Sequence, residues 1–198
     1  QTRLVGSEMC IRDRKYSLQY LLNLIAPDCN IVQVDGITEG AACTTLLAKE
    51  FIDNDEPLLM ANSDQFVEWD SNETLYAFSN GDCDGGILTF PASHPKWSYA
   101  KLDDDGFVSE VAEKKPISEH ATVGVYWWKK GSDYVKYAEQ MIEKNIRTNG
   151  EFYVCPVFNE AIGDDKRVRI KEIDKDGMWG IGTPEDLNYF LKNYEGDI

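Results

Sequence analysis

The chain has 198 residues, 42% of them hydrophobic and 12% aromatic, which is enough to build and bury the core of one globular domain. Its formal net charge of −15, without clustered Lys or Arg, excludes nucleic acid and anionic membranes as main partners, because both bind basic patches. The sequence shows no signal-peptide pattern, no apolar run near the ~18 residues of a membrane span and no CxxC pair, so we expect a cytoplasmic protein with reduced cysteines.

Residues 1–14 differ in character from the rest of the chain. They have no amphipathic period, and the segment VGSEMCIRDR at positions 5–14 resembles a translated sequencing-adapter read. We therefore interpret residues 1–14 as an adapter artefact, with an exposed disordered arm as the alternative. Residues 15–198 are expected to form a single domain that is incomplete at its N-terminus.

Strand and helix signals alternate after this segment. Residues 30–35 (NIVQVD) predict a strand, and residues 39–52 predict a helix with an apolar side. Leu58–Ala61 is an apolar run that predicts the C-terminal end of a central parallel strand. A strand, a helix and a second strand in this order are typical of the βαβ unit of a parallel sheet.

The middle of the chain is richer in strand signals. Four segments rich in β-branched and aromatic residues predict strands, and DDDG at 103–106 predicts a hairpin turn. The strands are expected at residues 85–92, 97–103, 107–113 and 121–128. On the last of these, Trp127 and Trp128 must face opposite ways, so we expect one in the core and the other lining a ligand site or covering a sheet edge.

Two helices complete the predicted α/β domain, which we expect to be a mixed, mostly parallel sheet flanked by helices. Residues 132–145 place apolar side chains on one face. The last helix has Thr183 as its cap and Pro184 at its first position. Its predicted apolar stripe consists of Leu187, Phe190, Leu191 and Tyr194.

Three stretches carry residues suited to ligand chemistry. Asp64 follows the strand at Leu58–Ala61, where ligands of open α/β sheets bind, and its carboxylate suits Mg²⁺; an ordinary polar turn is the alternative. Gly40 and its alanine neighbours allow a ligand close to the backbone, although such small residues also serve helix packing. Glu113 and Lys114 pair an acceptor for sugar hydroxyls with a cation for phosphate, although charged turns of this kind are commonly just solvated.

Taken together, four motifs resemble those of the sugar-1-phosphate nucleotidylyltransferases, also called nucleotide-sugar pyrophosphorylases. The small bacterial members that serve capsule or other surface polysaccharide synthesis are the most similar. The resemblance covers nearly the whole chain after residue 14 and depends on the order and spacing of the motifs. They are TEGAA (38–42), ANSDQ (61–65), EKKP (113–116) followed by VGVYWW (123–128), and GIGTPEDL (180–187).

The resemblance implies a Rossmann-like, GT-A-like nucleotidyltransferase fold and Mg²⁺-dependent transfer of a nucleotidyl group from a nucleoside triphosphate to a sugar 1-phosphate. It further implies that Asp64 binds the metal and that Lys114 contacts the sugar phosphate, both as catalytic residues. The substrate-binding residues implied are Gly40 against the base with Ala41, Asn62, Glu113 toward the sugar hydroxyls, Lys115, and Gly124 beside the sugar ring.

The chain departs from the family pattern at three places. Nothing before Lys15 matches the glycine-rich loop that cradles the triphosphate, so we expect the first βα unit to be missing and the fragment to be inactive as given. Gly180 stands where an Asp commonly provides a second metal ligand. The single Lys before Pro becomes Lys114 and Lys115, of which we favour Lys114 for the phosphate.

Two other functions stay open at this point. The first is a metal-dependent glycosyltransferase of the related GT-A fold, with Asp82-Cys83-Asp84 as its DxD motif, for which a solvated turn is the alternative. The second is a non-catalytic domain that binds a sugar nucleotide or has a regulatory role. The sequence names neither the base nor the sugar, and it leaves open whether the chain forms a homo-oligomer.

Overall fold

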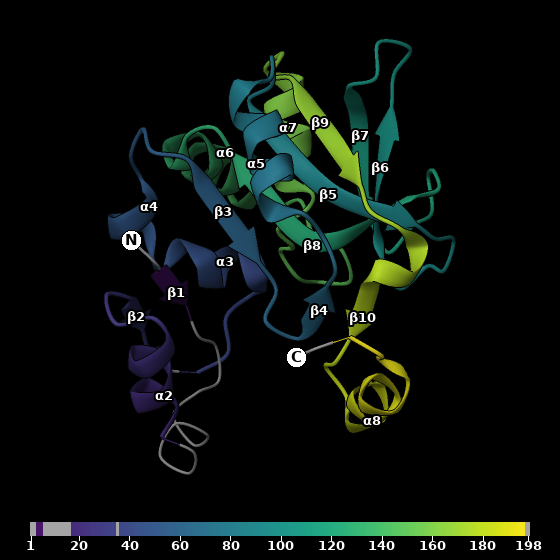
Figure 1. Ribbon diagram of the computed structural model, residues 1–198. Coiled ribbons are helices and arrows are strands. Elements are labelled where there is room, and N and C mark those ends of the chain that lie inside the picture. The colour runs from purple at the N-terminus through teal and green to yellow at the C-terminus, as the bar shows by residue number, and fades with distance from the viewer. Residues whose placement is uncertain (1–2, 6–16, 35, 197–198) are drawn as a thin grey trace.

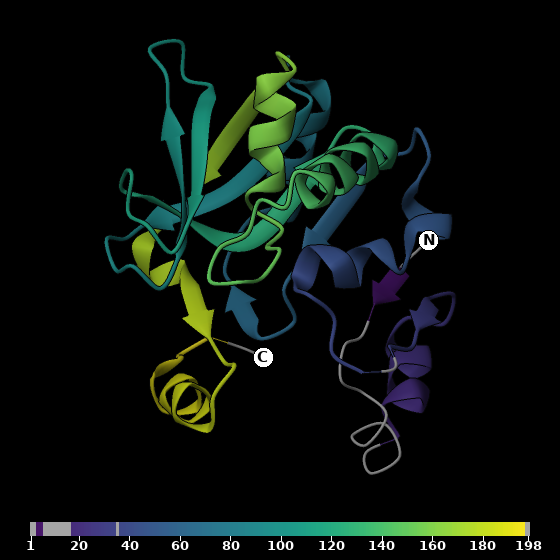
Figure 2. The same ribbon diagram turned by 180° about the vertical axis from the view of Figure 1, so that it is seen from behind.

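A computed structural model describes residues 3–5, 17–34 and 36–196. Its centre is a mixed β-sheet with helices packed on both faces (Figures 1 and 2). The predicted α/β class, with a central sheet flanked by helices, is confirmed. In the part of the chain that the structure describes, no helix has both the length and the apolar composition needed to cross a bilayer.

Five strands of the central sheet lie in the order β7-β6-β8-β5-β9, and β3 pairs with β8 as well. Their bounds are β3 Leu58–Ala61, β5 Gly85–Pro91, β6 Ser98–Leu102, β7 Val108–Glu113, β8 His120–Trp128 and β9 Val168–Glu172. Within this sheet only β5 and β9 pair in parallel, and all other pairings are antiparallel. The expectation of a mostly parallel sheet was therefore wrong.

Strand β3 does not occupy the central, parallel position predicted for it. It pairs with β8 in antiparallel register, Leu58 opposite Trp128, and with no other strand among the described residues. Its residues alternate between half-buried and exposed, and Leu59 is 43% exposed. Four consecutive apolar residues suggested burial on both faces, but an edge strand buries only one of them.

Strand β8 is the best-buried element of the sheet. Every residue from Ala121 to Trp128 is buried, and the strand has partners along both of its edges. Its β-branched and aromatic side chains suit a pleated surface packed on two sides. The β-branched and aromatic patterns from 85 to 128 thus predict the four strands β5 to β8 and their positions correctly.

The two tryptophans of β8 anchor the helices on the two faces of the sheet. Trp128 stacks on Phe158 with 4.3 Å between ring centroids, in a core shared with α6 (Gly131–Glu143) and α7 (Val157–Gly163). Trp127 stacks on Phe78 of α5 (Ser71–Asn80) at 5.8 Å. Both rings are buried, so the expectation that one would line a ligand site or cover an edge was wrong.

The N-terminal elements gather beside the edge that carries β3 (Figure 1). They comprise β1 Arg3–Val5, α2 Leu18–Ile25, β2 Asn30–Val32, α3 Ala41–Leu46 and α4 Lys49–Ile52. Strand β1 pairs in parallel with β2 and belongs to the segment 1–14 that the fold prediction excluded; residues 1–2 and 6–14 lie outside the described residues. The single helix expected over 39–52 is broken between α3 and α4.

The C-terminal elements form a small unit of their own beside the sheet. The 3₁₀ helix η1 (Lys175–Gly177) leads into β10 (Met178–Gly180), which pairs with β4 (Gln65–Val67) and precedes α8 (Pro184–Asn193). Thr183 caps α8 as predicted, its hydroxyl accepting a hydrogen bond from the Asp186 backbone N–H at 3.1 Å. Phe190 and Tyr194 pack against Phe66 of β4.

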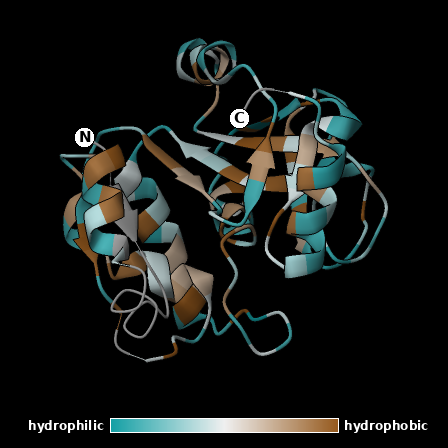
Figure 3. Cartoon of the chain, turned by 60° about the horizontal axis from the view of Figure 1, so that its bottom comes forward, coloured by the Kyte–Doolittle hydropathy of each residue, from teal (hydrophilic) through white to brown (hydrophobic). Residues whose placement is uncertain are grey.

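Figure 3 shows hydrophobic residues along the strands and also on the helices near the N-terminus, whereas most loops are hydrophilic. The apolar stripe predicted on α8 is only partly buried. Phe190 is in the core, but Leu187 and Leu191 are 41% and 61% exposed. The helix is held by one aromatic cluster rather than by a continuous apolar face.

We expect Phe158→Ala to lower the free energy of unfolding by about 3–5 kcal/mol, because it removes a fully buried ring and leaves a cavity against Trp128. Urea denaturation measures this change. Tyr76→Ala, at a 70% exposed site on α5, is the matched control and should change stability by less than about 0.5 kcal/mol. Equal effects of the two variants would contradict the packing described.

Candidate functional site

Asp64 lies where the end of β3 meets the turn after β10. Its backbone carbonyl accepts a hydrogen bond from the Ile181 N–H at 2.9 Å. Its carboxylate lies over Gly182, where a Cβ would stand 2.9 Å from Oδ2. The side chain is exposed. Two motifs more than a hundred residues apart, 61–65 and 180–187, therefore meet at this carboxylate.

Gly180 stands close to Asp64 and brings no second carboxylate. It pairs with Gln65 in the β4–β10 ladder, and a Cβ at this position would meet no atom within 4 Å. Among the described residues, no group of three or more His, Cys, Asp or Glu side chains is arranged to hold a metal ion. Asp64 is thus a single carboxylate that would need ligands from a substrate or from water to bind Mg²⁺.

Asn62 and Gly124 form a second pair at the end of β3. The Asn62 N–H donates to the Gly124 carbonyl at 3.0 Å. Gly124 has φ +75°, and its Cβ position is filled by the Asn62 side-chain amide. This close approach explains in structural terms why position 124 has no side chain. The space that the resemblance assigns to the sugar ring is here next to an amide that can donate and accept hydrogen bonds.

Gly40 is the N-cap residue of α3 and is packed against a distant part of the chain. It has φ +133°, and a Cβ would lie 2.5 Å from both the backbone N and the O of Phe152. The same stretch is held by two hydrogen bonds of 2.9 Å, from Ala42 N–H to the Phe152 carbonyl and from Phe152 N–H to the Glu39 carbonyl. Ala41, the first residue of α3, is exposed.

Glu113 ends β7 and is half-buried. The Ser98 hydroxyl donates a hydrogen bond to its Oε2 atom. Burial raises the pKa of Glu113, and the bond from Ser98 and the charge of Lys114 only partly oppose that shift. The carboxyl therefore combines an orientation fixed by Ser98 with burial that favours its neutral form.

Lys114 follows Glu113 in a left-handed backbone conformation, with φ 56°. Its Nζ donates to the Tyr153 hydroxyl at 2.5 Å and lies 4.6 Å from the centre of that ring. The hydrogen bond to Tyr153 raises the pKa of Lys114. Lys115 is exposed. Of the two lysines, Lys114 is the one whose ammonium has a defined partner, Tyr153.

Two residues of the site were missed at the sequence level. Ser98 orients Glu113 from the opposite strand of the β6–β7 hairpin, and Tyr153 contacts Lys114 from a distant part of the chain. The aromatic run EFY at 151–153 was the available signal, but its role could not be assigned without knowing what it touches. Of the residues that the sequence analysis assigned to one site, the structure pairs Asn62 with Gly124 and Glu113 with Lys114. Asp64 and Gly40 instead contact Gly182 and Phe152, and Ala41 and Lys115 are exposed.

The alternative metal motif, Asp82-Cys83-Asp84, is already engaged in other contacts. Asp82 forms ion pairs with Arg167 at 2.9 Å and with Arg169 at 3.0 Å, and these cations hold its pKa below the usual range. Asp84 accepts from the Arg167 N–H, and Cys83 is buried in the core. Carboxylates paired with guanidinium groups are poorly placed to bind a metal.

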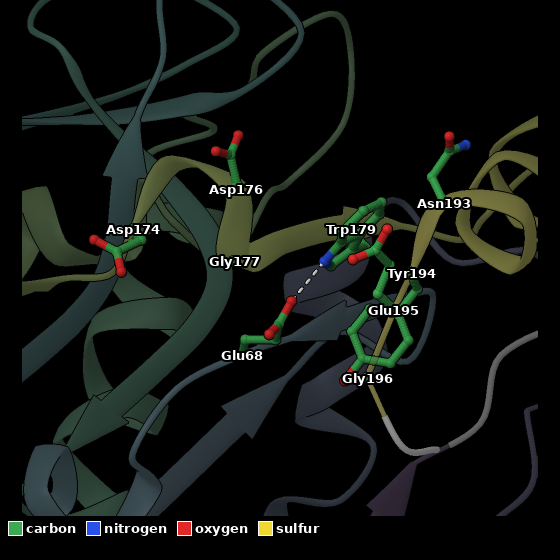
Figure 4. Close-up of a pocket in the computed structure, with 9 residues that line it drawn as sticks. All are labelled: Glu68, Asp174, Asp176, Gly177, Trp179, Asn193, Tyr194, Glu195 and Gly196. Carbon is green, nitrogen blue, oxygen red and sulfur yellow. Dashed lines mark hydrogen bonds between the residues drawn. The ribbon is translucent and has the colours of Figure 1, made fainter.

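A pocket of about 390 Å³ lies between β10 and the end of α8 (Figure 4). The indole N–H of Trp179 donates to Glu68 at its edge, at 2.9 Å. None of the residues assigned to the site lines this pocket. Its acidic side chains, Glu68, Asp174, Asp176 and Glu195, would repel a phosphate, so we do not assign the substrate to it.

We expect Gly40→Ala to lower the free energy of unfolding by about 2–4 kcal/mol, because it adds a clash with the Phe152 backbone to the cost of a positive φ. Gly36→Ala is the control, since Gly36 has φ +94° but no atom within 4 Å of its Cβ position. It should cost only about 1–2 kcal/mol. Chemical denaturation compares the two, and an equal loss would show that the contact with Phe152 is absent.

Glu113 should make stability depend on pH. Because its pKa is raised above the unfolded value of 4.5, its contribution is complete below pH 4.5 and is lost as the pH rises through the folded pKa. Wild type should therefore lose stability relative to Glu113→Gln over that interval. Denaturation at several pH values measures this. Glu110→Gln, an exposed position on the same strand, is the control; a pH-independent difference for Glu113→Gln would contradict its burial.

Comparisons with known proteins agree in fold. No protein-family model matches the sequence, and no match was found among curated proteins. Among solved structures, a nucleoside-diphosphate-sugar pyrophosphorylase from Vibrio cholerae RC9 matches with a TM-score of 0.78 and 21% identity, over 96% of this chain and 79% of that one. An inositol-1-phosphate CTP transferase from T. maritima matches with a TM-score of 0.71 and 16% identity, over 96% and 74%. The chain therefore shares the fold of these sugar-phosphate nucleotidyltransferases.

Proposed function

We propose that this protein transfers a nucleotidyl group from a nucleoside triphosphate to a sugar 1-phosphate, giving a nucleotide sugar and pyrophosphate for capsule or other surface polysaccharide synthesis. One observation carries the proposal. The motifs that resemble this enzyme family contact one another across long stretches of chain, as Asp64 does with Gly182 and Asn62 with Gly124. They do so on the fold that solved nucleotidyltransferases share.

The sugar side of the proposed site consists of Glu113, Lys114 and Asn62. The ionised Glu113 carboxylate accepts hydrogen bonds from sugar hydroxyls, and Ser98 fixes its orientation. The Lys114 ammonium neutralises charge on the sugar phosphate, which matters in a chain of net charge −15. On the nucleotide side, Gly40 and Ala41 present a surface without bulky side chains for the base.

Asp64 fits a role as the protein ligand of Mg²⁺. Its carboxylate is exposed, it faces Gly182 where no side chain intrudes, and Mg²⁺ accepts one carboxylate when phosphate oxygens and waters complete its coordination. When bound, the ion would neutralise charge on the phosphates during transfer. With Gly180 in place of a second carboxylate, the substrate would have to supply more of the ligands.

The reaction requires positioning more than covalent chemistry. An oxygen of the sugar phosphate forms a new bond to the α-phosphorus, the bond from that phosphorus to the bridging oxygen of the β-phosphate breaks, and pyrophosphate leaves with the electron pair. Lys114 holds the attacking phosphate, Glu113 holds the sugar that carries it, and Gly40 holds the nucleotide. The site accordingly needs no Ser or His nucleophile.

Binding by the 198-residue chain provides the decisive test. We expect sugar 1-phosphates and nucleoside-diphosphate sugars to bind in calorimetric titrations, because both reach Glu113 and Lys114. Turnover is expected to be low, since no stretch of the sequence matches the glycine-rich phosphate loop. Mg²⁺ should tighten nucleotide-sugar binding, and Asp64→Ala should remove that gain, about tenfold or more in Kd, without changing stability.

Asp55→Ala is the matched control, because Asp55 is an exposed carboxylate that pairs with Lys130 at 2.9 Å. It should keep the full effect of Mg²⁺. Binding of nucleotide sugars without sugar 1-phosphates would favour a glycosyltransferase. Binding of nucleotide sugars that neither Mg²⁺ nor Asp64→Ala alters would favour a non-catalytic domain. Binding of neither ligand class would rule out the proposal.

A further inference from the structure

The segment from Arg147 to Tyr153 is held rigidly against the start of α3. Its β-bridge between Thr148 and Glu151 closes a tight turn. The Arg147 guanidinium donates from Nη2 to Glu39 Oε2 at 2.5 Å and from Nη1 to the Gly150 carbonyl at 2.9 Å, and it lies 3.9 Å from the centre of the Phe152 ring. The turn is therefore held both by hydrogen bonds of its own backbone and by the side chain of Arg147.

Phe152 completes this attachment. Its side chain is buried, with 1% of its surface exposed, and its backbone N–H and carbonyl are both bonded to the 39–42 stretch. A residue with buried side chain and fully bonded backbone has little conformational freedom. The backbone that carries the next residue, Tyr153, is therefore fixed in position as well.

Tyr153 uses this fixed position to contact Lys114. Its hydroxyl oxygen accepts from Lys114 Nζ at 2.5 Å, and its ring lies below the ammonium at 4.6 Å. Lys114 is itself constrained, since its backbone has φ 56° and its N–H donates to the Trp97 carbonyl at 3.0 Å. The position of the ammonium is thus restrained by its contact with Tyr153 and by the fixed backbone of Lys114.

The chemistry of this pair suits a phosphate. An ammonium has three N–H donors, and only one is used toward Tyr153. A phenol that accepts from an ammonium keeps its own O–H as a donor. The pair therefore offers a phosphate group several donors together with a positive charge, in an arrangement that exists before the ligand arrives.

We propose that Tyr153 is a binding and positioning residue for the phosphate of the sugar 1-phosphate, which it anchors jointly with Lys114. This inference rests on the proposed function and adds to it a residue outside the recognised motifs. Its hydroxyl orients the ammonium and donates a hydrogen bond to a phosphate oxygen. Two carboxylates lie near Lys114: Glu113, on the same turn, and Glu151. Carboxylates repel phosphate, so binding of the phosphate falls to Lys114 and Tyr153.

The test compares Tyr153→Phe with wild type in calorimetric titrations. The ligands are the 1-phosphates of α-D-glucose, galactose and mannose, inorganic phosphate, and each free sugar. Loss of a charge-assisted hydrogen bond should raise the Kd for the bound sugar 1-phosphate and for phosphate about tenfold. The free sugar should bind as it does to wild type, since it lacks the group that Tyr153 contacts. The exposed Tyr76→Phe on α5 is the matched control.

A double-mutant cycle separates positioning from a general structural effect. In a Lys114→Met background, Tyr153→Phe should change the Kd by less than about twofold, because the two residues act on one phosphate. The urea midpoint of Tyr153→Phe should match that of wild type. Full additivity of the two substitutions, or unchanged binding in Tyr153→Phe, would overturn the inference while the proposed function stands. No binding of any sugar 1-phosphate by wild type would overturn both.

Discussion

The burial of strand β8 on both faces is the constraint on which the rest of the structure depends. Because it has partners along both edges, β8 sets the register of β3, β5 and β6, and its adjacent tryptophans hold a helical layer on each face. Gly124 lies within it, and the hydrogen bond from Asn62 fixes the end of β3 against it. The position of Asp64, two residues further on, follows from that pairing.

A second set of contacts joins the parts of the site that β8 does not reach. The backbone of Phe152 secures the start of α3, and Tyr153 secures the ammonium of Lys114. The nucleotide side and the sugar-phosphate side of the proposed site are therefore attached to consecutive residues. In an enzyme that works by positioning two substrates, such a shared support keeps their relative distance constant.

The sequence analysis succeeded where the signals were local. Long runs of β-branched and aromatic residues predict β5 to β8, and Thr183-Pro184 predicts the start of α8, because the determinants lie within the elements themselves. It assigned no element to residues 71–80, although Asp70 caps α5 by accepting from the Glu73 N–H at 2.8 Å. It placed β3 wrongly, since an apolar run does not reveal which strands pair with it. The contact of Tyr153 was beyond reach for the same reason, because it depends on how distant segments pack. Ser98, in contrast, faces Glu113 across the predicted hairpin, and only the register of that hairpin was missing.

The contact between Gly40 and Phe152 restricts the choice of amino acid at these two positions to different degrees. On the Phe152 side it uses only backbone atoms, so any apolar residue that fills the same space in the core leaves the hydrogen bonds intact. On the Gly40 side, every other amino acid brings a Cβ into that backbone. Variation among descendants of this sequence should thus be allowed at one partner and forbidden at the other, although the two share a single interface.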